Sequence, residues 1–155
     1  METLEFTNYI LNPHSLPFLI VGVVIIVLGV MILLENIKSS IHLAFYALSL
    51  SIAWSLIAQA IAYSTSSGEL ALFWYKILWV GAIFIAPSAY TFTVIVLGIP
   101  KTREQIILAY VTFVPFLFTI PGDLFVAAAG KYSWGYVPEG GYSTGCLFGF
   151  LCFLS

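Results

Sequence analysis

The stretch LPFLIVGVVIIVLGVMILL, residues 16–34, runs for 19 residues without a charged side chain. A helix needs roughly 20 predominantly apolar residues to cross a bilayer, so this stretch predicts a membrane-spanning helix. Three further apolar stretches follow at 41–63, 70–97 and 105–126, and a shorter one covers 145–155. Hydrophobic runs of this length are typical of helices and not of barrel strands. We therefore expect an all-α integral membrane protein with four complete transmembrane helices and a partial fifth, in a single membrane domain over residues 1–155.

The composition supports a membrane protein. The chain is 61% hydrophobic and only 8% charged, whereas a soluble domain carries about 25% charged residues. A net charge of −2 without a basic cluster does not suggest a nucleic-acid partner, and we expect the lipid bilayer as the partner. The two cysteines, Cys146 and Cys152, lack the spacing of zinc ligands, and we expect no metal and no cofactor. The first apolar stretch follows Glu2 and Glu5 instead of basic residues, which favours a retained span over a cleaved signal peptide.

The basic residues predict how the chain is oriented. The loops at 35–40 and 98–104 hold three Lys and Arg residues, whereas the N-terminus and the loops at 64–69 and 127–144 hold one. Loops rich in Lys and Arg stay in the cytoplasm. We therefore expect the N-terminus on the outside of the membrane.

Two polar side chains lie inside apolar stretches and are candidate ligand or coupling positions. Lys76 lies six residues into the third stretch, where its long side chain would reach the outer interface. Alternatively, it is a buried charge, for which Asp123 on the same side is the candidate partner. Gln59, in the second stretch, is a candidate for a hydrogen bond between helices.

Small residues recur at spacings of three and four along the second apolar stretch. Such a stripe allows two helix backbones to approach closely in a membrane. The predicted helix-packing stripe consists of Ala44, Ala47, Ser51, Ser55, Ala58 and Ala62.

Prolines and an aromatic loop mark the second half of the chain. Pro87 and Pro115 lie inside apolar stretches, and each removes a backbone donor, which predicts a kink. The loop at 130–142 is rich in glycine, tyrosine and tryptophan. These aromatics fit a belt at the membrane interface. Alternatively, Trp134 and Tyr136 belong to an outer lid that contacts a ligand.

The sequence shows no catalytic signature. It contains no phosphate-binding glycine loop, no zinc-protease motif and no nucleophile-elbow motif. His14 and His42 stand apart from carboxylates and cysteines. We therefore expect that the chain is not an enzyme.

A series of aromatic, glycine and proline residues completes the pattern. The series is Ala44-Phe45, Ala53-Trp54-Ser55, ALFWYKILWVG at 71–81, Pro87, Gly98, Pro115 and KYSWGYVPEG at 131–140. In this order the residues resemble the N-terminal seven-helix membrane region of prokaryotic sensor histidine kinases, over roughly residues 16–155. The resemblance implies a sensory input domain in the cytoplasmic membrane of a prokaryotic cell, ahead of the cytoplasmic modules of a two-component system.

The chain also departs from that family. It stops eleven residues into the stretch that would form the fifth helix, with no phosphoacceptor histidine motif and no ATP-binding glycine boxes. We therefore expect a fragment without kinase activity, which works with cytoplasmic signalling modules or a homodimer partner. The alternatives are part of a small transporter or channel and a structural membrane assembly protein.

Overall fold

The structure is a computed structural model that describes residues 9, 12–99, 103–120, 126–132 and 135–140. These residues form four α-helices and a β-hairpin, preceded by the short 3₁₀ helix η2 (Pro13–Ser15). The helices are α1 (Leu16–Glu35), α2 (Ser40–Tyr63), α3 (Gly68–Val96) and α4 (Arg103–Thr119), and the strands are β1 (Val126–Tyr132) and β2 (Gly135–Gly140).

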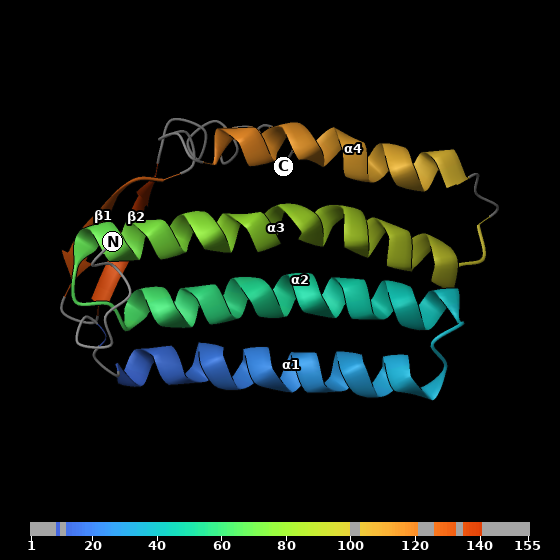
Figure 1. The fold of residues 1–155 in the computed structure, drawn as a ribbon, viewed down its shortest axis with the longest axis horizontal. Coiled ribbons are helices and arrows are strands. Elements are labelled where there is room, and N and C mark those ends of the chain that lie inside the picture. The colour runs from blue at the N-terminus through green and yellow to red at the C-terminus, as the bar shows by residue number, and fades with distance from the viewer. Residues whose placement is uncertain (1–8, 10–11, 100–102, 121–125, 133–134, 141–155) are drawn as a thin grey trace, which may run out of the picture.

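The four helices lie side by side in chain order and form one layer, with neighbouring helices antiparallel (Figure 1). The hairpin and the loop between α2 and α3 lie at one end of the layer. The loops that join α1 to α2 and α3 to α4 lie at the other end. Lys38 and Lys131 are therefore at opposite ends, in agreement with the predicted alternation of the loops.

Three helices, α1, α2 and α3, are long and apolar enough to cross a membrane. The outward surface of α1 is made of large apolar side chains, among them Ile20, Val24, Val27 and Met31, which are 50% to 63% exposed. Such a surface would be unfavourable in water and suits contact with lipid. The chain is therefore a mainly helical membrane protein.

Glycines bring α1 and α2 into close contact. A Cβ atom at Gly29 would lie 2.9 Å from the Cβ of Ser49, and one at Gly22 would lie 3.0 Å from Cγ1 of Ile57. Both glycines are buried. The two backbones can approach because neither glycine carries a side chain, as small residues allow in membrane helix pairs.

The small residues of α2 contact both neighbouring helices, α1 and α3. Ser49 and Ala53 are buried on the side of α1, where they meet Gly29 and Gly22. Ser55 of the predicted stripe lies on the side of α3, where its hydroxyl donates to the carbonyl of Leu78 at 3.4 Å. The burial of the stripe is uneven: Ala44, Ala58 and Ala62 are buried, whereas Ala47, Ser51 and Ser55 are half-buried.

The fourth helix is shorter than the predicted span 105–126. It ends at Thr119, and Val126 already belongs to β1. Pro121 and Gly122 follow the helix in the sequence, and proline disfavours a helical conformation in the residue before it. With 17 residues, α4 is an apolar helix shorter than the three that are long enough to span. The predicted partial span 145–155 lies outside the described residues.

The expectation of an all-α chain is wrong at the hairpin, in a region that we expected to be a loop. The strands β1 and β2 pair antiparallel, with Tyr132 opposite Gly135 and Lys131 opposite Tyr136. Only two residues separate the strands in the sequence, as in common β-hairpins. Aromatic and β-branched residues such as Tyr132, Tyr136 and Val137 favour strands, and the abundant glycines masked this signal.

Candidate functional site

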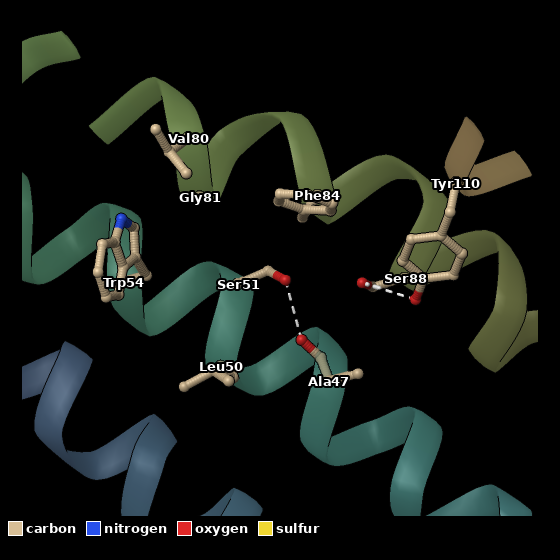
Figure 2. Close-up of a pocket in the computed structure, with 9 residues that line it drawn as sticks. All are labelled: Ala47, Leu50, Ser51, Trp54, Val80, Gly81, Phe84, Ser88 and Tyr110. Carbon is tan, nitrogen blue, oxygen red and sulfur yellow. Dashed lines mark hydrogen bonds between the residues drawn. The ribbon is translucent and has the colours of Figure 1, made fainter. Parts of the chain in front are cut away.

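An open crevice of about 330 Å³ lies where α2, α3 and α4 meet (Figure 2). This volume falls at the lower end of the range for small-molecule sites. The lining is mostly apolar and aromatic, with a few hydroxyl groups. It consists of Ala47, Leu50, Ser51 and Trp54 from α2, Val80, Gly81, Phe84 and Ser88 from α3, and Tyr110 from α4.

Gly81 sets the distance between α2 and α3 at the crevice. A Cβ atom at this position would lie 2.6 Å from Cδ1 of Trp54 and 2.7 Å from Oγ of Ser55. It would also lie 3.0 Å from the backbone carbonyl oxygen of Ser51. The absence of a side chain therefore allows α2 to pack directly on the backbone of α3.

Trp54 lies at the entrance of the crevice and connects the two helices. Its indole Nε1 donates to the backbone carbonyl of Ile77 on α3 at 3.0 Å. The side chain is 49% exposed, and that of neighbouring Leu50 is 42% exposed. The entrance therefore lies on the exposed surface of two helices that are long enough to span a membrane.

A pair of hydroxyls connects α3 to α4 at the other end of the crevice. The Oγ of Ser88 and the phenol oxygen of Tyr110 are 3.2 Å apart, within hydrogen-bond distance (Figure 2). Ser88 is only 2% exposed. The ring of Tyr110 also packs against that of Phe84, with a centroid separation of 6.4 Å. Polar and aromatic contacts thus hold α4 against α3 at this point.

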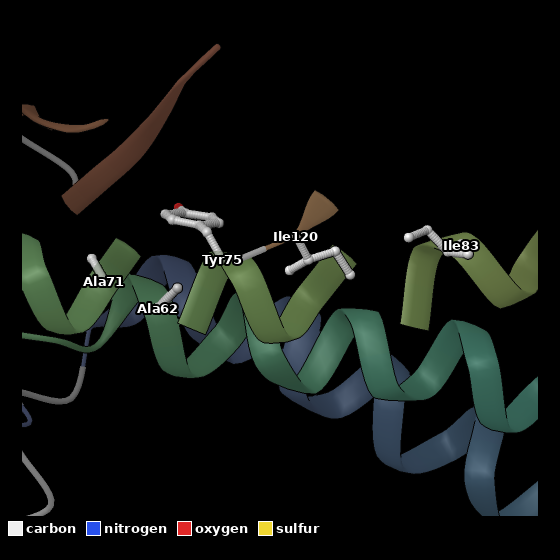
Figure 3. Close-up of a cluster of buried hydrophobic side chains, with 5 residues drawn as sticks. All are labelled: Ala62, Ala71, Tyr75, Ile83 and Ile120. Atoms are coloured by element: carbon white, nitrogen blue, oxygen red, sulfur yellow. The ribbon is translucent and has the colours of Figure 1, made fainter. Parts of the chain in front are cut away.

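The hairpin is attached to the opposite end of α3 by Tyr75. This residue is almost fully buried in an apolar cluster with Ala62, Ala71 and Ile120, and Figure 3 shows its ring directed toward the hairpin. The Tyr75 hydroxyl donates to the backbone carbonyl of Tyr136 at 2.7 Å. A buried side chain of α3 therefore determines where β2 lies.

Tyr136 makes the matching contacts from the hairpin side. Its hydroxyl donates to the backbone carbonyl of Ser66 at 3.2 Å. Its ring lies against Gly68, where an added Cβ would come within 3.3 Å of the ring. Tyr136 thus connects the hairpin to the loop between α2 and α3 and to the start of α3.

The N-terminal segment reaches the same end of the molecule. The indole Nε1 of Trp74 donates to the hydroxyl of Tyr9 at 3.1 Å, and Tyr9 forms an antiparallel β-bridge with Thr65. The side-chain amide of Asn12 donates to the carbonyl of Tyr63 at 3.2 Å. This end of the layer therefore holds the N-terminal segment, the α2–α3 loop and the hairpin together.

The structure separates the predicted ligand and coupling positions from the crevice. Tyr136 lies at the hairpin contact, as described above. Lys76 is half-buried on α3, and Gln59 is half-buried on α2. Asp123 and Trp134 lie outside the described residues, so the pairing of Lys76 with Asp123 and a ligand contact of Trp134 stay predictions.

The two prolines have different surroundings. Pro87 is fully buried, and α3 continues through it as one helix. Its carbonyl accepts a hydrogen bond from the hydroxyl of Thr91 at 2.8 Å. Pro115 lies inside α4 and is exposed. The predicted kinks stay predictions.

Sequence reasoning missed most of the crevice. Trp54 and Gly81 stood in the segments that carry the family resemblance, but they received no functional role. Ser88 and Tyr110 were not singled out, because no local pattern connects hydroxyls that are 22 residues apart on different helices. The sequence feature that could have pointed to Ser88 is its position next to Pro87, inside the apolar stretch 70–97.

Among the described residues, no group of three or more His, Cys, Asp and Glu side chains lies close enough together to hold a metal ion. The chemistry that the crevice offers in this part of the chain is therefore apolar and aromatic contact with hydrogen bonding by hydroxyl groups. Such groups bind and orient molecules.

Comparison with known proteins gives a match to a protein family. The family model described as the N-terminal 7TM region of histidine kinase matches residues 17–150. No curated protein and no solved structure matches the chain. The matched range begins at the second residue of α1 and runs past the hairpin, so it includes every residue of the crevice. The chain belongs to the family of N-terminal 7TM regions of histidine kinases.

Proposed function

We propose that this chain is the multi-pass sensory input domain of a histidine-kinase-type signal transduction protein in the cytoplasmic membrane of a prokaryotic cell. The family match over residues 17–150 carries the proposal. The matched region is the input part of such kinases, so the chain itself performs no catalysis. Its partners are cytoplasmic signalling modules and, in the assembled receptor, a second copy of the chain.

The crevice provides a physical route for a signal. Glycine contacts pack α1, α2 and α3 tightly, at Gly22 and Gly29 on one side of α2 and at Gly81 on the other. In contrast, α4 contacts α3 at the crevice through Ser88 and Tyr110. A ligand or a change in the membrane that alters this contact would shift α4 relative to the other helices. The shift would reach the loop between α3 and α4.

The orientation follows from the charges. We propose four spans with the N-terminus and the hairpin outside and the Lys38 loop in the cytoplasm, as the positive-inside rule requires. In this orientation the loop between α3 and α4 also faces the cytoplasm, where the kinase modules of such receptors lie. A displacement of α4 would therefore move the cytoplasmic loop between α3 and α4.

Cysteine labelling tests this orientation. We expect that Lys131→Cys, introduced after both native cysteines are replaced by serine, reacts with a membrane-impermeant maleimide in intact cells. Lys38→Cys should react only after the cells are lysed. Both positions are exposed at the ends of the layer, so accessibility within the protein does not limit labelling. Labelling of Lys38→Cys in intact cells, with Lys131→Cys protected, would show the opposite orientation.

Autophosphorylation tests the sensory role. The complete gene product that contains this chain is expressed in inverted membrane vesicles and supplied with radiolabelled ATP. We expect Gly81→Ala to change the rate of autophosphorylation at least about fivefold, the scale of typical coupling between sites. Met31→Leu on the lipid-facing surface of α1 is the matched control and should leave the rate unchanged. The absence of autophosphorylation, or equal effects of the two variants, would contradict the proposal.

A further inference from the structure

One hydroxyl hydrogen of the Ser88–Tyr110 pair is not used in the hydrogen bond between the two residues. Ser88 and Tyr110 each carry one hydroxyl hydrogen, and a bond between the two oxygens uses only one of them. Within the described part of the chain, neither hydroxyl has another hydrogen-bond partner. Whichever residue donates to the other, one hydroxyl hydrogen still lacks an acceptor at the edge of the crevice.

The described residues around this donor make no further hydrogen bond to it. Ser88 is 2% exposed, and it precedes the end of α3 at Val96 by eight residues, about 12 Å along the helix axis. A polar group buried among apolar groups costs free energy when its hydrogen bond is not made. The pair therefore favours a bound molecule that brings an acceptor.

The other residues that line the crevice indicate the shape and charge of the rest of the bound molecule. The rings of Trp54, Phe84 and Tyr110 offer flat apolar contact, and the described lining contains no charged side chain. The exposed edge of Trp54 opens the crevice toward lipid. These features fit an uncharged molecule with a flat apolar body that arrives through the bilayer.

We propose that the crevice binds an uncharged, membrane-soluble carbonyl compound, whose oxygen accepts the spare hydrogen of the Ser88–Tyr110 pair. The inference rests on the proposed sensory function and names the class of stimulus. Such a ligand would hold α3 and α4 together, because its acceptor bonds the hydroxyl pair that joins the two helices here. Trp54 and Phe84 position the apolar body.

A phospholipid ester also carries a carbonyl oxygen, but its ester groups lie in the interfacial region of the bilayer. The hydroxyl pair lies about two turns inside the end of α3. The proposal therefore commits to a free molecule. Nanodiscs made of ester-linked or ether-linked phosphatidylcholine separate the two sources, because the ether lipid has no carbonyl group.

The experiment uses the full chain in these nanodiscs and a photoreactive carbonyl probe, benzophenone, with peptide mass spectrometry to locate the adducts. Competition by 9-fluorenone is compared with competition by fluorene, which has the same three rings and no oxygen. We expect adducts at the crevice, at positions such as Leu50 and Val80. Fluorenone should compete about fivefold better than fluorene in both lipids, because one hydrogen bond contributes about that factor to binding.

Two variants test whether the carbonyl oxygen of the ligand bonds to the hydroxyls of Ser88 and Tyr110. The double variant Ser88→Ala, Tyr110→Phe should abolish the advantage of fluorenone over fluorene. Thr112→Val removes a hydroxyl of α4 that donates to the carbonyl of Leu108, away from the crevice, and should preserve the advantage. The comparison of the two competitors in the unmodified chain does not depend on the folding of any variant.

Three results would overturn the inference: equal competition by fluorenone and fluorene, adducts spread evenly along α1, or an advantage of fluorenone confined to the ether lipid. The first would show that the carbonyl oxygen adds nothing to binding, the second that the probe does not select the crevice, and the third that the lipid ester is the occupant. The binding experiment involves no kinase. Autophosphorylation without carbonyl binding, or binding without autophosphorylation, would therefore separate a failure of this inference from a failure of the sensory role.

Discussion

Replacing Gly81 by alanine is expected to destabilise the protein, because overpacking a tightly packed site costs about 1–3 kcal/mol. The added Cβ would lie 2.6 Å from Cδ1 of Trp54 and 3.0 Å from the backbone carbonyl oxygen of Ser51. The indole can shift, but the backbone of α2 cannot move without separating the two helices. The loss should therefore exceed the gain of about 1 kcal/mol that alanine brings to a helix in place of glycine.

The same substitution at Gly22 is the matched control. There the nearest atom to an added Cβ is the side-chain Cγ1 of Ile57, at 3.0 Å, and the nearest backbone oxygen is 3.5 Å away. A side chain can yield by a few tenths of an ångström, so Gly22→Ala should destabilise the protein less than Gly81→Ala does. The midpoint of thermal unfolding in detergent, followed by circular dichroism, compares the two variants. A lower midpoint for Gly22→Ala than for Gly81→Ala would contradict the proposed role of Gly81.

The membrane helices were predictable because their signal is local. A run such as 16–34 needs no tertiary information, since length and hydrophobicity alone satisfy the requirement for crossing a bilayer. The end of α4 was less predictable, because the apolar residues Leu124, Phe125 and Val126 follow Pro121-Gly122-Asp123, and Val126 belongs to β1. Hydrophobicity alone does not separate an apolar strand at a membrane surface from the last turns of a helix.

The hairpin and the crevice depend on contacts between distant segments. Tyr75 and Tyr136 are 61 residues apart, and the hydrogen bond between them determines where β2 lies. Ser88 and Tyr110 meet only because α4 packs against α3. The predicted small-residue stripe treated α2 as having one partner, whereas α2 lies between α1 and α3. The buried residues Ser49 and Ala53 lie off the spacing of that stripe, on the side of α1.

Removing the hydroxyl of Tyr75 should release the hairpin from α3. In Tyr75→Phe the carbonyl of Tyr136 loses its donor, and the ring of residue 75 stays in place in the apolar cluster. An unmade hydrogen bond at a buried group costs about 1–3 kcal/mol. The fraction of molecules with an open hairpin should therefore rise by a factor of about 5 to 150.

Trypsin measures this opening, because Lys131 lies in β1 and is exposed, and because no Lys or Arg follows it in the chain. A protease needs an unfolded segment, so the rate of cleavage at Lys131 in nanodiscs should rise with the open fraction. Tyr110→Phe is the matched control, since it removes a phenol hydroxyl that bonds Ser88 and not the hairpin. It should leave the rate unchanged. If both variants accelerate cleavage equally, the hairpin responds to the stability of the whole helix layer. Acceleration in Tyr75→Phe alone would show that the hairpin opens as a separate unit, attached to α3 by Tyr75.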